Sequence, residues 1–174
     1  MRFEEKKVSS TLIYKGKIIT VERDEVILPN GRQATREVVR HTGGSGIVCE
    51  KDGKILLVKQ FRYPFNRELL EIPAGKLNEG EDPATTAIRE LEEEGGIIAG
   101  RVVKLFDVYP TPAYDDEIIR IYQAFDLSES EVHLDEDEFL TSVWMEKDKL
   151  KDMIKNGEIK DAKTIIALQA VLDK

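Results

Sequence analysis

The residues best suited to chemistry in this chain are four glutamates crowded into the stretch RELEEEGG at residues 89–96. Like charges this close repel one another. At the C-terminal end of a helix they also oppose the helix dipole, which favours cations there. The stretch is therefore either a well-solvated acidic surface or the binding site of a cation.

The spacing of the glutamates favours a cation site. On a helix, Glu90, Glu93 and Glu94 lie three and four positions apart and share one face, whereas Glu92 points elsewhere as plain surface. Ligands that are all oxygen select hard divalent ions, so Mg²⁺ is the expected metal, with Mn²⁺ as the alternative. The single cysteine, Cys49, excludes a cysteine-based metal site.

A longer pattern encloses the acidic stretch. In order along the chain, its members are Gly75, Glu81, Arg89, Glu90, Leu91, Glu93, Glu94, Gly96 and Ile97. Their types and spacing match the signature of the Nudix hydrolases, which the chain therefore resembles. The resemblance implies an α+β protein, a Nudix α/β/α sandwich around a mixed sheet. It also implies metal-dependent hydrolysis of nucleoside diphosphates that are linked to another group.

The resemblance also implies roles for the residues of the pattern. Glu90 and Glu94 are the expected principal metal ligands, completed by the backbone carbonyl of Ala74. Glu93 is expected to act beside them in catalysis. The residues expected to hold this arrangement in place are Gly75, Glu81 and Arg89.

Segments outside the signature resemble one branch of the family, the ADP-ribose pyrophosphatases. They are REVVRH at 36–41, QFRYP at 60–64, EIPAG at 71–75 and YPTPAYDDE at 109–117. Pro112 lies 16 residues beyond Gly96, a spacing that resembles these enzymes. Thr42 and Ala113 stand where the branch commonly has proline and glycine, so the substrate preference stays open.

Three functions are therefore weighed. The first is hydrolysis of ADP-ribose to AMP and ribose 5-phosphate, or of a related ADP-sugar. The second is a broad or GDP-mannose-type nucleotide-sugar pyrophosphatase. The third is a non-catalytic Nudix domain that senses a nucleotide, against which the intact signature argues.

Two groups of residues are expected to bind the substrate. Arg62 follows a central strand and could grip the diphosphate with two hydrogen bonds, and Glu71 could reach a ribose hydroxyl. The alternative for Arg62 is an ion pair with Glu68 or Glu71. Arg36 and Glu37 are expected at the adenine end, with ordinary cross-strand charge pairing as their alternative.

The resemblance implies a catalytic base in the acidic loop at residues 134–139. Glu138 matches the place of that base best, and Glu136 is the second choice. A base needs only to come within hydrogen-bond reach of the water it deprotonates. The alternative is an acidic surface loop without a function.

Capping and turn signals place the acidic stretch at the end of one helix. Asp82 and Pro83 are expected to begin it, and Gly95-Gly96 to end it. Its expected buried stripe is Ala84, Ile88 and Leu91. Strands are predicted at 47–49, 54–60, 69–73, 97–109, 117–125 and 142–145, and two further helices at 147–156 and 161–172.

The first part of the chain exceeds what a minimal Nudix domain needs. Residues 1–41 are expected to form an N-terminal β arm for dimerisation and substrate contacts, and residues 42–174 the Nudix hydrolase domain. The resemblance implies a homodimer in which Arg36 and Glu37 serve the partner's site. The net charge of −8 argues against nucleic-acid or membrane partners, and the composition fits a cytoplasmic protein.

Overall fold

A computed structural model describes residues 3–136 and 138–172. Asp137, which belongs to the predicted acidic loop, lies outside the described residues. The chain divides into two compact units, Met1–Gly43 with Tyr109–Ile118, and Gly44–Val108 with Ile119–Lys174. The segment Tyr109–Ile118 therefore joins the N-terminal unit, although the sequence interpretation placed it in the second domain.

The first unit contains an antiparallel sheet of β1 (Lys6–Lys15), β2 (Thr20–Ile27) and β3 (Gln33–Arg40), in that order. A turn at 28–31, which contains the Asn-Gly pair typical of hairpins, connects β2 to β3, and Gly31 adopts a left-handed conformation there with φ of 82°. Val39 in β3 binds the segment Tyr109–Ile118 through a hydrogen bond from its amide to the Tyr114 carbonyl at 2.7 Å. Local turn chemistry thus sets this sheet, and one distant segment extends it.

The second unit is an α/β/α sandwich. Its strands are β4 (Gly44–Lys51), β5 (Lys54–Arg62), β6 (Arg67–Glu71), β7 (Ala74–Lys76), β8 (Ile97–Val108), β9 (Ile119–Glu129) and β10 (Leu140–Glu146). Its helices are α1 (Pro83–Gly95), α2 (Lys147–Lys155) and α3 (Ala162–Leu172), with a short 3-10 helix, η1 (Tyr63–Phe65). In the described residues the sheet runs β10-β5-β4-β9-β8, with β6 beside β5 and β7 beside β4. The β4–β9 pair is parallel and the other pairs are antiparallel, so the sheet is mixed as predicted.

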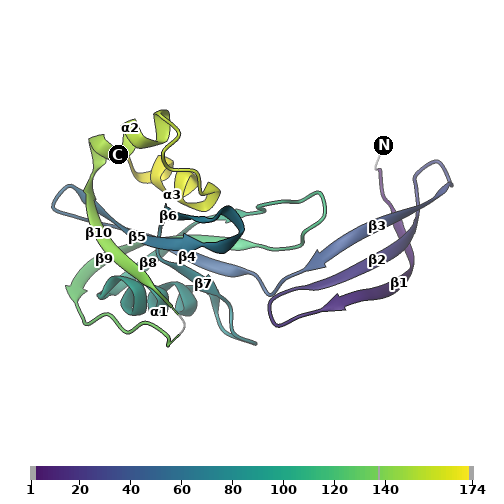
Figure 1. The fold of residues 1–174 in the computed structure, drawn as a ribbon, viewed down its shortest axis with the longest axis horizontal. Helices are drawn as coiled ribbons and strands as arrows, with labels where there is room; N and C mark the ends of the chain where they lie inside the picture. The colour runs from purple at the N-terminus through teal and green to yellow at the C-terminus, as the bar shows by residue number, and fades with distance from the viewer. Residues whose placement is uncertain (1–2, 137, 173–174) are drawn as a thin grey trace. The chain divides into compact units, whose positions relative to one another are not determined.

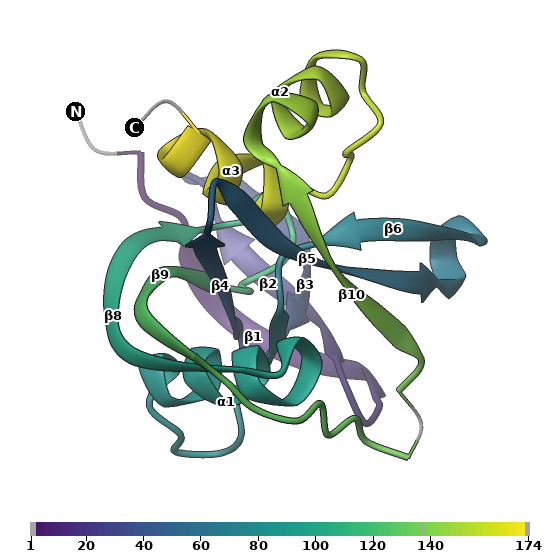
Figure 2. The same cartoon turned by 90° about the vertical axis from the view of Figure 1, so that its left-hand side faces the viewer.

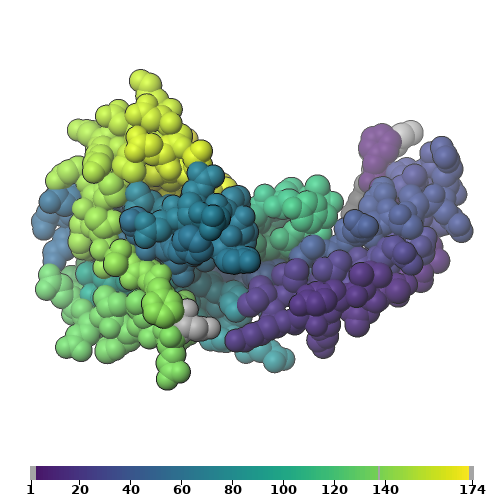
Figure 3. Space-filling view, viewed as in Figure 1, coloured from purple at the N-terminus to yellow at the C-terminus, as the bar shows by residue number. Residues whose placement is uncertain are grey.

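Helices cover both faces of this sheet. Helix α1 lies on one face, and α2 and α3 lie on the other (Figures 1 and 2). Alternate residues of β4 serve the two layers: Ile47 packs with Leu91 of α1, whereas Val48 packs with Leu168 of α3. Atoms of β6 and α3 lie side by side on the second face (Figure 3).

Helix α1 begins and ends where the sequence predicts. The Asp82 side chain accepts hydrogen bonds from the amides of Ala84 and Thr85, and Gly96 closes the helix in a left-handed conformation with φ of 63°. These caps satisfy backbone groups that the helix itself leaves unpaired.

The predicted buried stripe of α1 is only partly correct. Leu91 is fully buried, but Ala87 takes the second apolar position and Ile88 is only half-buried. Glu90 and Glu94 are buried as well, so two acidic side chains point toward the protein rather than away from it. Helical periodicity identified the shared face of the glutamates, but it could not show that backbone groups of β7 cover this face.

The predicted strand at 69–73 corresponds to β6, which already ends at Glu71, and a separate strand, β7, begins at Ala74. Pro73 lies between them, and proline has no N–H to donate to a strand ladder. Its carbonyl still accepts a hydrogen bond from the Ile47 amide at 2.9 Å. After this break the chain changes its partner strand: β6 pairs with β5, whereas β7 pairs with β4. The change brings Ala74 and Gly75 beneath α1.

In the described residues, no helix is long and apolar enough to cross a membrane.

Candidate metal and pyrophosphate site

The centre of the site is the contact between β7 and the end of α1. A Cβ atom added to Gly75 would lie 1.8 Å from Glu90 Oε1, so only glycine fits there. The next residue back, Ala74, donates its amide to Glu94 Oε2 at 2.9 Å. Two signature glutamates are therefore seated against the backbone of a single short strand.

These two carboxyl groups are almost fully buried. Glu90 is 6% exposed and Glu94 3% exposed. Burial raises the pKa of Glu90 to about 7 and the pKa of Glu94 to about 8, because a buried carboxylate loses its hydration. The negative charge of Glu138 adds to both increases, which places Glu138 near this pair. A cation bound here would favour the ionised forms.

Arg89 organises the solvent side of the same cluster. Its Nη1 atom lies 2.8 Å from both Glu90 Oε1 and Glu93 Oε2. Its Nε atom lies 3.2 Å from Glu81 Oε1, and this hydrogen bond is the main reason that the pKa of Glu81 falls to about 2. Glu81 also accepts the Asn78 amide at 3.1 Å. The Glu81–Arg89 pair expected from the sequence is thus present.

The donor set fits a divalent cation. Glu90, Glu93 and Glu94 supply oxygen only, and two of them are buried acids whose charge lacks hydration. Within residues 3–136 and 138–172, no group of three acidic, histidine or cysteine side chains is already arranged to hold a metal ion. Arg89 instead bonds to Glu90 and Glu93, so a metal would compete with this guanidinium for oxygen atoms.

Arg62 and the buried Glu71 form a partly exposed ion pair. Arg62 Nε and Nη2 lie 2.6 Å and 2.7 Å from the two oxygens of Glu71, which is 2% exposed. Lys163 also contacts Glu71 Oε2. Burial alone would raise the pKa of Glu71, but Arg62 and Lys163 lower it to about 2. This pair is the alternative that the sequence analysis left open for Arg62.

Arg36 and Glu37 lie on β3 in the first unit, and both are exposed. Arg36 makes two hydrogen bonds to Glu5, from Nε at 2.8 Å and from Nη2 at 2.5 Å. In the sheet register, Glu37 lies opposite Arg23 on β2. Local charge pairing thus accounts for the present position of Arg36.

The two candidate bases differ in exposure. Glu138 is half-buried, and its amide donates to the Asp135 carbonyl at 3.0 Å. Glu136 is exposed. The loop that carries them starts against α1, where the His133 amide donates to the Glu93 carbonyl at 2.9 Å.

The NUDIX domain family matches residues 39–168, and the nucleoside diphosphate sugar hydrolase N-terminal domain matches residues 5–39. The chain belongs to the Nudix family. It is 42% identical to an ADP-ribose pyrophosphatase of Bacillus subtilis (strain 168), over 95% of this chain and 91% of that protein.

Two further similarities agree with this assignment. The Nudix chain is also 42% identical to a methanol dehydrogenase activator of Bacillus methanolicus, over 96% of this chain and 92% of that protein. A crystal structure of an ADP compounds hydrolase shares the fold with a TM-score of 0.87 at 24% identity, covering 98% of this chain and 93% of the other. The protein is a hydrolase of a family whose members generally need a divalent metal.

The sequence did not predict several residues that make contacts around the candidate site of this Nudix hydrolase. Glu92 is not plain surface, because its Oε1 accepts the Ser130 hydroxyl at 2.9 Å and so holds the start of the acidic loop. Lys163 and Thr164, at the start of α3, contact Glu71 and the Ile72 amide. The only local signal was the helix-capping pattern around Asp161, which does not reveal such distant partners.

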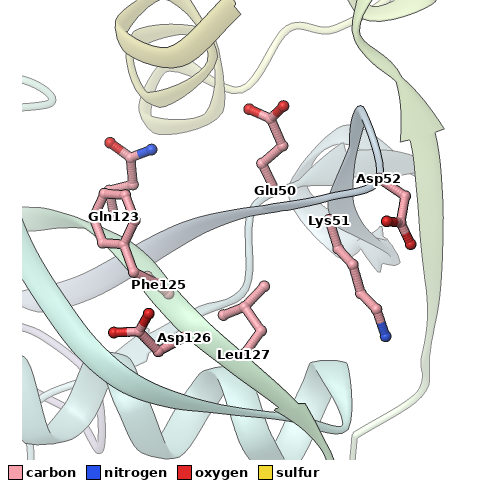
Figure 4. A pocket seen from close by; sticks show the side chains of 8 residues that line it. Glu50, Lys51, Asp52, Gln123, Phe125, Asp126 and Leu127 are labelled. Carbon is pink, nitrogen blue, oxygen red and sulfur yellow. The ribbon is translucent and has the colours of Figure 1, made fainter.

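A separate hollow lies at the other end of β4. It has a volume of about 470 Å³ and is lined in part by Glu50, Asp52 and Asp126 (Figure 4). Lys147 pairs with Glu50 at 3.1 Å, so part of this acidic charge is already neutralised. None of the residues predicted for the Nudix site lines it.

Proposed function

We propose that this Nudix hydrolase cleaves the pyrophosphate bond of ADP-ribose, or of a related ADP-sugar, and that ADP-ribose yields AMP and ribose 5-phosphate. The observation that carries the proposal is the buried pair Glu90 and Glu94 against Ala74 and Gly75. This pair lies within a complete signature. The chain also aligns over almost its whole length with an ADP-ribose pyrophosphatase.

Glu90, Glu94 and the Ala74 carbonyl would hold Mg²⁺ or Mn²⁺. Such a cation neutralises the pyrophosphate oxygens and lowers the pKa of an attacking water. Arg89 would keep Glu90 and Glu93 on the same side of α1, since its Nη1 atom bonds to both. In this arrangement Glu93 is the signature carboxylate next to the reacting groups, and Gly75 and Glu81 keep their supporting roles.

Glu138 would take the proton from the attacking water. Its charge acts on both Glu90 and Glu94, and its half-buried position suits a base that must stay near the pair. Glu136 is exposed and remains the second choice.

Arg62 would bind the diphosphate. Its Nε and Nη2 atoms are held by Glu71, its side chain is still 38% exposed, and Nη1 is not part of that pair. Because both oxygens of Glu71 are engaged, we assign this residue the positioning of Arg62 rather than a contact with the ribose. A fixed guanidinium loses less entropy when it binds phosphate.

Arg36 and Glu37 would contact the adenine end of a substrate in the partner subunit of a homodimer. The support is the exposed apolar surface of β1, which includes Val8, Leu12 and Tyr14. Size-exclusion chromatography with light scattering should show a dimer. A stable monomer would contradict this part of the proposal.

A panel of nucleoside diphosphate sugars tests the reaction. With Mg²⁺ or Mn²⁺, we expect ADP-ribose to give the highest kcat/KM, with AMP and ribose 5-phosphate as products. Equal or higher values with GDP-mannose would favour the broader nucleotide-sugar enzyme. Tight ADP-ribose binding without product would favour a nucleotide sensor. The panel is needed because the chain is equally identical to two relatives with different names.

The cytoplasm is proposed as the location. Cys49, the single cysteine, is free and buried, and burial raises the pKa of its thiol to about 12. Disulfide chemistry therefore has no part in this proposal.

A further inference from the structure

The start of α3 is tied to the strand end that leads into the site. Asp161 Oδ2 accepts hydrogen bonds from the Thr164 amide at 3.0 Å and from its hydroxyl at 2.6 Å. The Thr164 hydroxyl oxygen in turn accepts the Ile72 amide at 2.8 Å. Thr164 is fully buried, so its hydroxyl has one fixed donor role and one fixed acceptor role.

Three consecutive residues of this strand end are each fixed by a different element. Ile72 is held by Thr164 of α3, the Pro73 carbonyl by Ile47 of β4, and the Ala74 amide by Glu94 of α1. The carbonyl of Ala74 therefore has little freedom to move. Its position depends on both helical layers, although α3 lies on the face opposite α1 (Figures 1 and 2).

The adjacent residue, Lys163, acts on the ion pair. It contacts Glu71 Oε2 and lies 3.1 Å from Asp161 Oδ2, and its side chain is 11% exposed. Glu71 is thus shared between two cations. Because Lys163 also pairs with Asp161, it holds the Glu71 carboxylate without leaving a surplus positive charge. Glu71 can then keep Nε and Nη2 of Arg62 in a fixed position, with Nη1 outside the pair.

We propose that Thr164 and Lys163 are positioning residues that act from behind the sheet. Thr164 fixes the Ala74 carbonyl for metal binding, and Lys163 holds Glu71 so that the Arg62 guanidinium stays directed toward the diphosphate. The inference rests on the proposed roles of Ala74 and Arg62. A purely structural role would make both residues stabilise α3 without a separate effect on metal or substrate.

Thr164→Val tests the first role. The change keeps the shape but leaves the Ile72 amide buried without its acceptor. We expect Mn²⁺ binding to the substrate-free protein, measured by electron paramagnetic resonance, to weaken about 10-fold, as is typical when a group that supports a metal ligand is removed. Thr164→Ser should restore it. If Thr164→Val does not fold, Thr164→Ala removes the same hydroxyl and is read in the same way.

Val171→Ala is the matched control for the stability of the helix. Val171 is buried on the same helix, and its apolar side chain cannot form any of the hydrogen bonds of this network. It should lower the melting temperature and leave Mn²⁺ affinity unchanged. Equal Mn²⁺ affinities in Thr164→Val and wild type, or an equal loss of affinity in Val171→Ala, would overturn the role of Thr164.

Lys163→Met tests the second role. Glu71 Oε2 would then lose a contact that holds it, and Arg62 would be less firmly positioned, so we expect KM for ADP-ribose to rise several-fold while Mn²⁺ affinity stays unchanged. Lys163→Arg should recover most of the loss. An unchanged KM would overturn the role of Lys163. If the wild-type protein neither binds Mn²⁺ nor cleaves ADP-ribose, the proposed function itself fails, which is a different result from either of these.

Discussion

Two buried carboxyl groups of this protein have the same chemistry and opposite behaviour. Glu71 is 2% exposed and Glu94 is 3% exposed. The pKa of Glu71 is lowered to about 2, whereas the pKa of Glu94 is raised to about 8. Burial raises both, but Glu71 contacts Arg62 and Lys163, while Glu94 accepts the Ala74 amide and has other acids beside it, with the charge of Arg62 as a smaller effect.

The difference separates a permanent charge from one that requires a partner. Glu71 carries its negative charge in the protein alone, so it can hold Arg62 in place at all times. Burial disfavours the ionised forms of Glu90 and Glu94, and a bound cation would stabilise them. In the proposed function, the first site orients the anionic substrate and the second binds the metal.

The largest expected effect comes from removing the carboxylate charge of a proposed metal ligand, Glu90 or Glu94. Glu90→Gln or Glu94→Gln should each lower kcat by about 10³-fold or more, because the metal loses a ligand without a large change in shape. Glu92→Gln is the matched control: it retains the oxygen that accepts the Ser130 hydroxyl and should remain active. Full activity in either Glu90→Gln or Glu94→Gln would mean that the metal site is wrongly assigned.

Removing the permanent charge should instead damage stability. Glu71→Gln leaves Arg62 and Lys163 facing each other without their shared carboxylate, at a cost of about 3 kcal/mol in the free energy of unfolding. Urea unfolding in metal-free buffer measures this change. Glu129→Gln, which breaks the exposed pair with Lys51, should leave the stability unchanged. An equally small loss in Glu71→Gln would remove the distinction between the two carboxyl groups.

The pH dependence of stability should differ in sign between the two sites. Glu90 and Glu94 have pKa values of about 7 and about 8 in the folded protein, above the ordinary value of 4.5. Between these values the folded state binds more protons than the unfolded state, so metal-free stability should fall as pH rises from about 5 to about 8. The contribution of Glu71 is instead complete above pH 4.5 and is lost as pH falls toward about 2.

Thermal unfolding at pH 5, 6.5 and 8 with a chelator present measures the first of these effects. Glu94→Gln should flatten the curve, and added Mg²⁺ should restore stability at pH 8. A metal-free stability that rises from pH 5 to pH 8 would contradict the raised pKa values of Glu90 and Glu94.

The smallest expected effect is local. Added Mg²⁺ should slow amide hydrogen exchange at Glu93 and Glu94, because the cation removes the repulsion at the end of α1. The Ile72 amide, held by Thr164, should exchange slowly with or without metal. Exchange at Glu93 and Glu94 that does not respond to Mg²⁺ would indicate that the cation does not bind at this helix end.

Much of this protein was determined by short-range patterns in the sequence. Capping residues set the start and end of α1, and the turn at 28–31 set the β2–β3 hairpin. The signature identified the family, and spacing alone placed Glu90, Glu93 and Glu94 on one helical face. The Glu81–Arg89 pair was also predictable, because its members are separated by only eight residues.

Only the tertiary structure decided how these groups are used. It turned Glu90 and Glu94 toward Ala74 and Gly75. It also brought Lys163 to Glu71 and Thr164 to Ile72, and each of these two pairs is separated by 92 residues in the sequence. The physical reason is range. Periodicity and capping report on neighbours within a few turns of chain, whereas the charge state of a buried carboxyl group depends on whichever distant cation the fold places beside it.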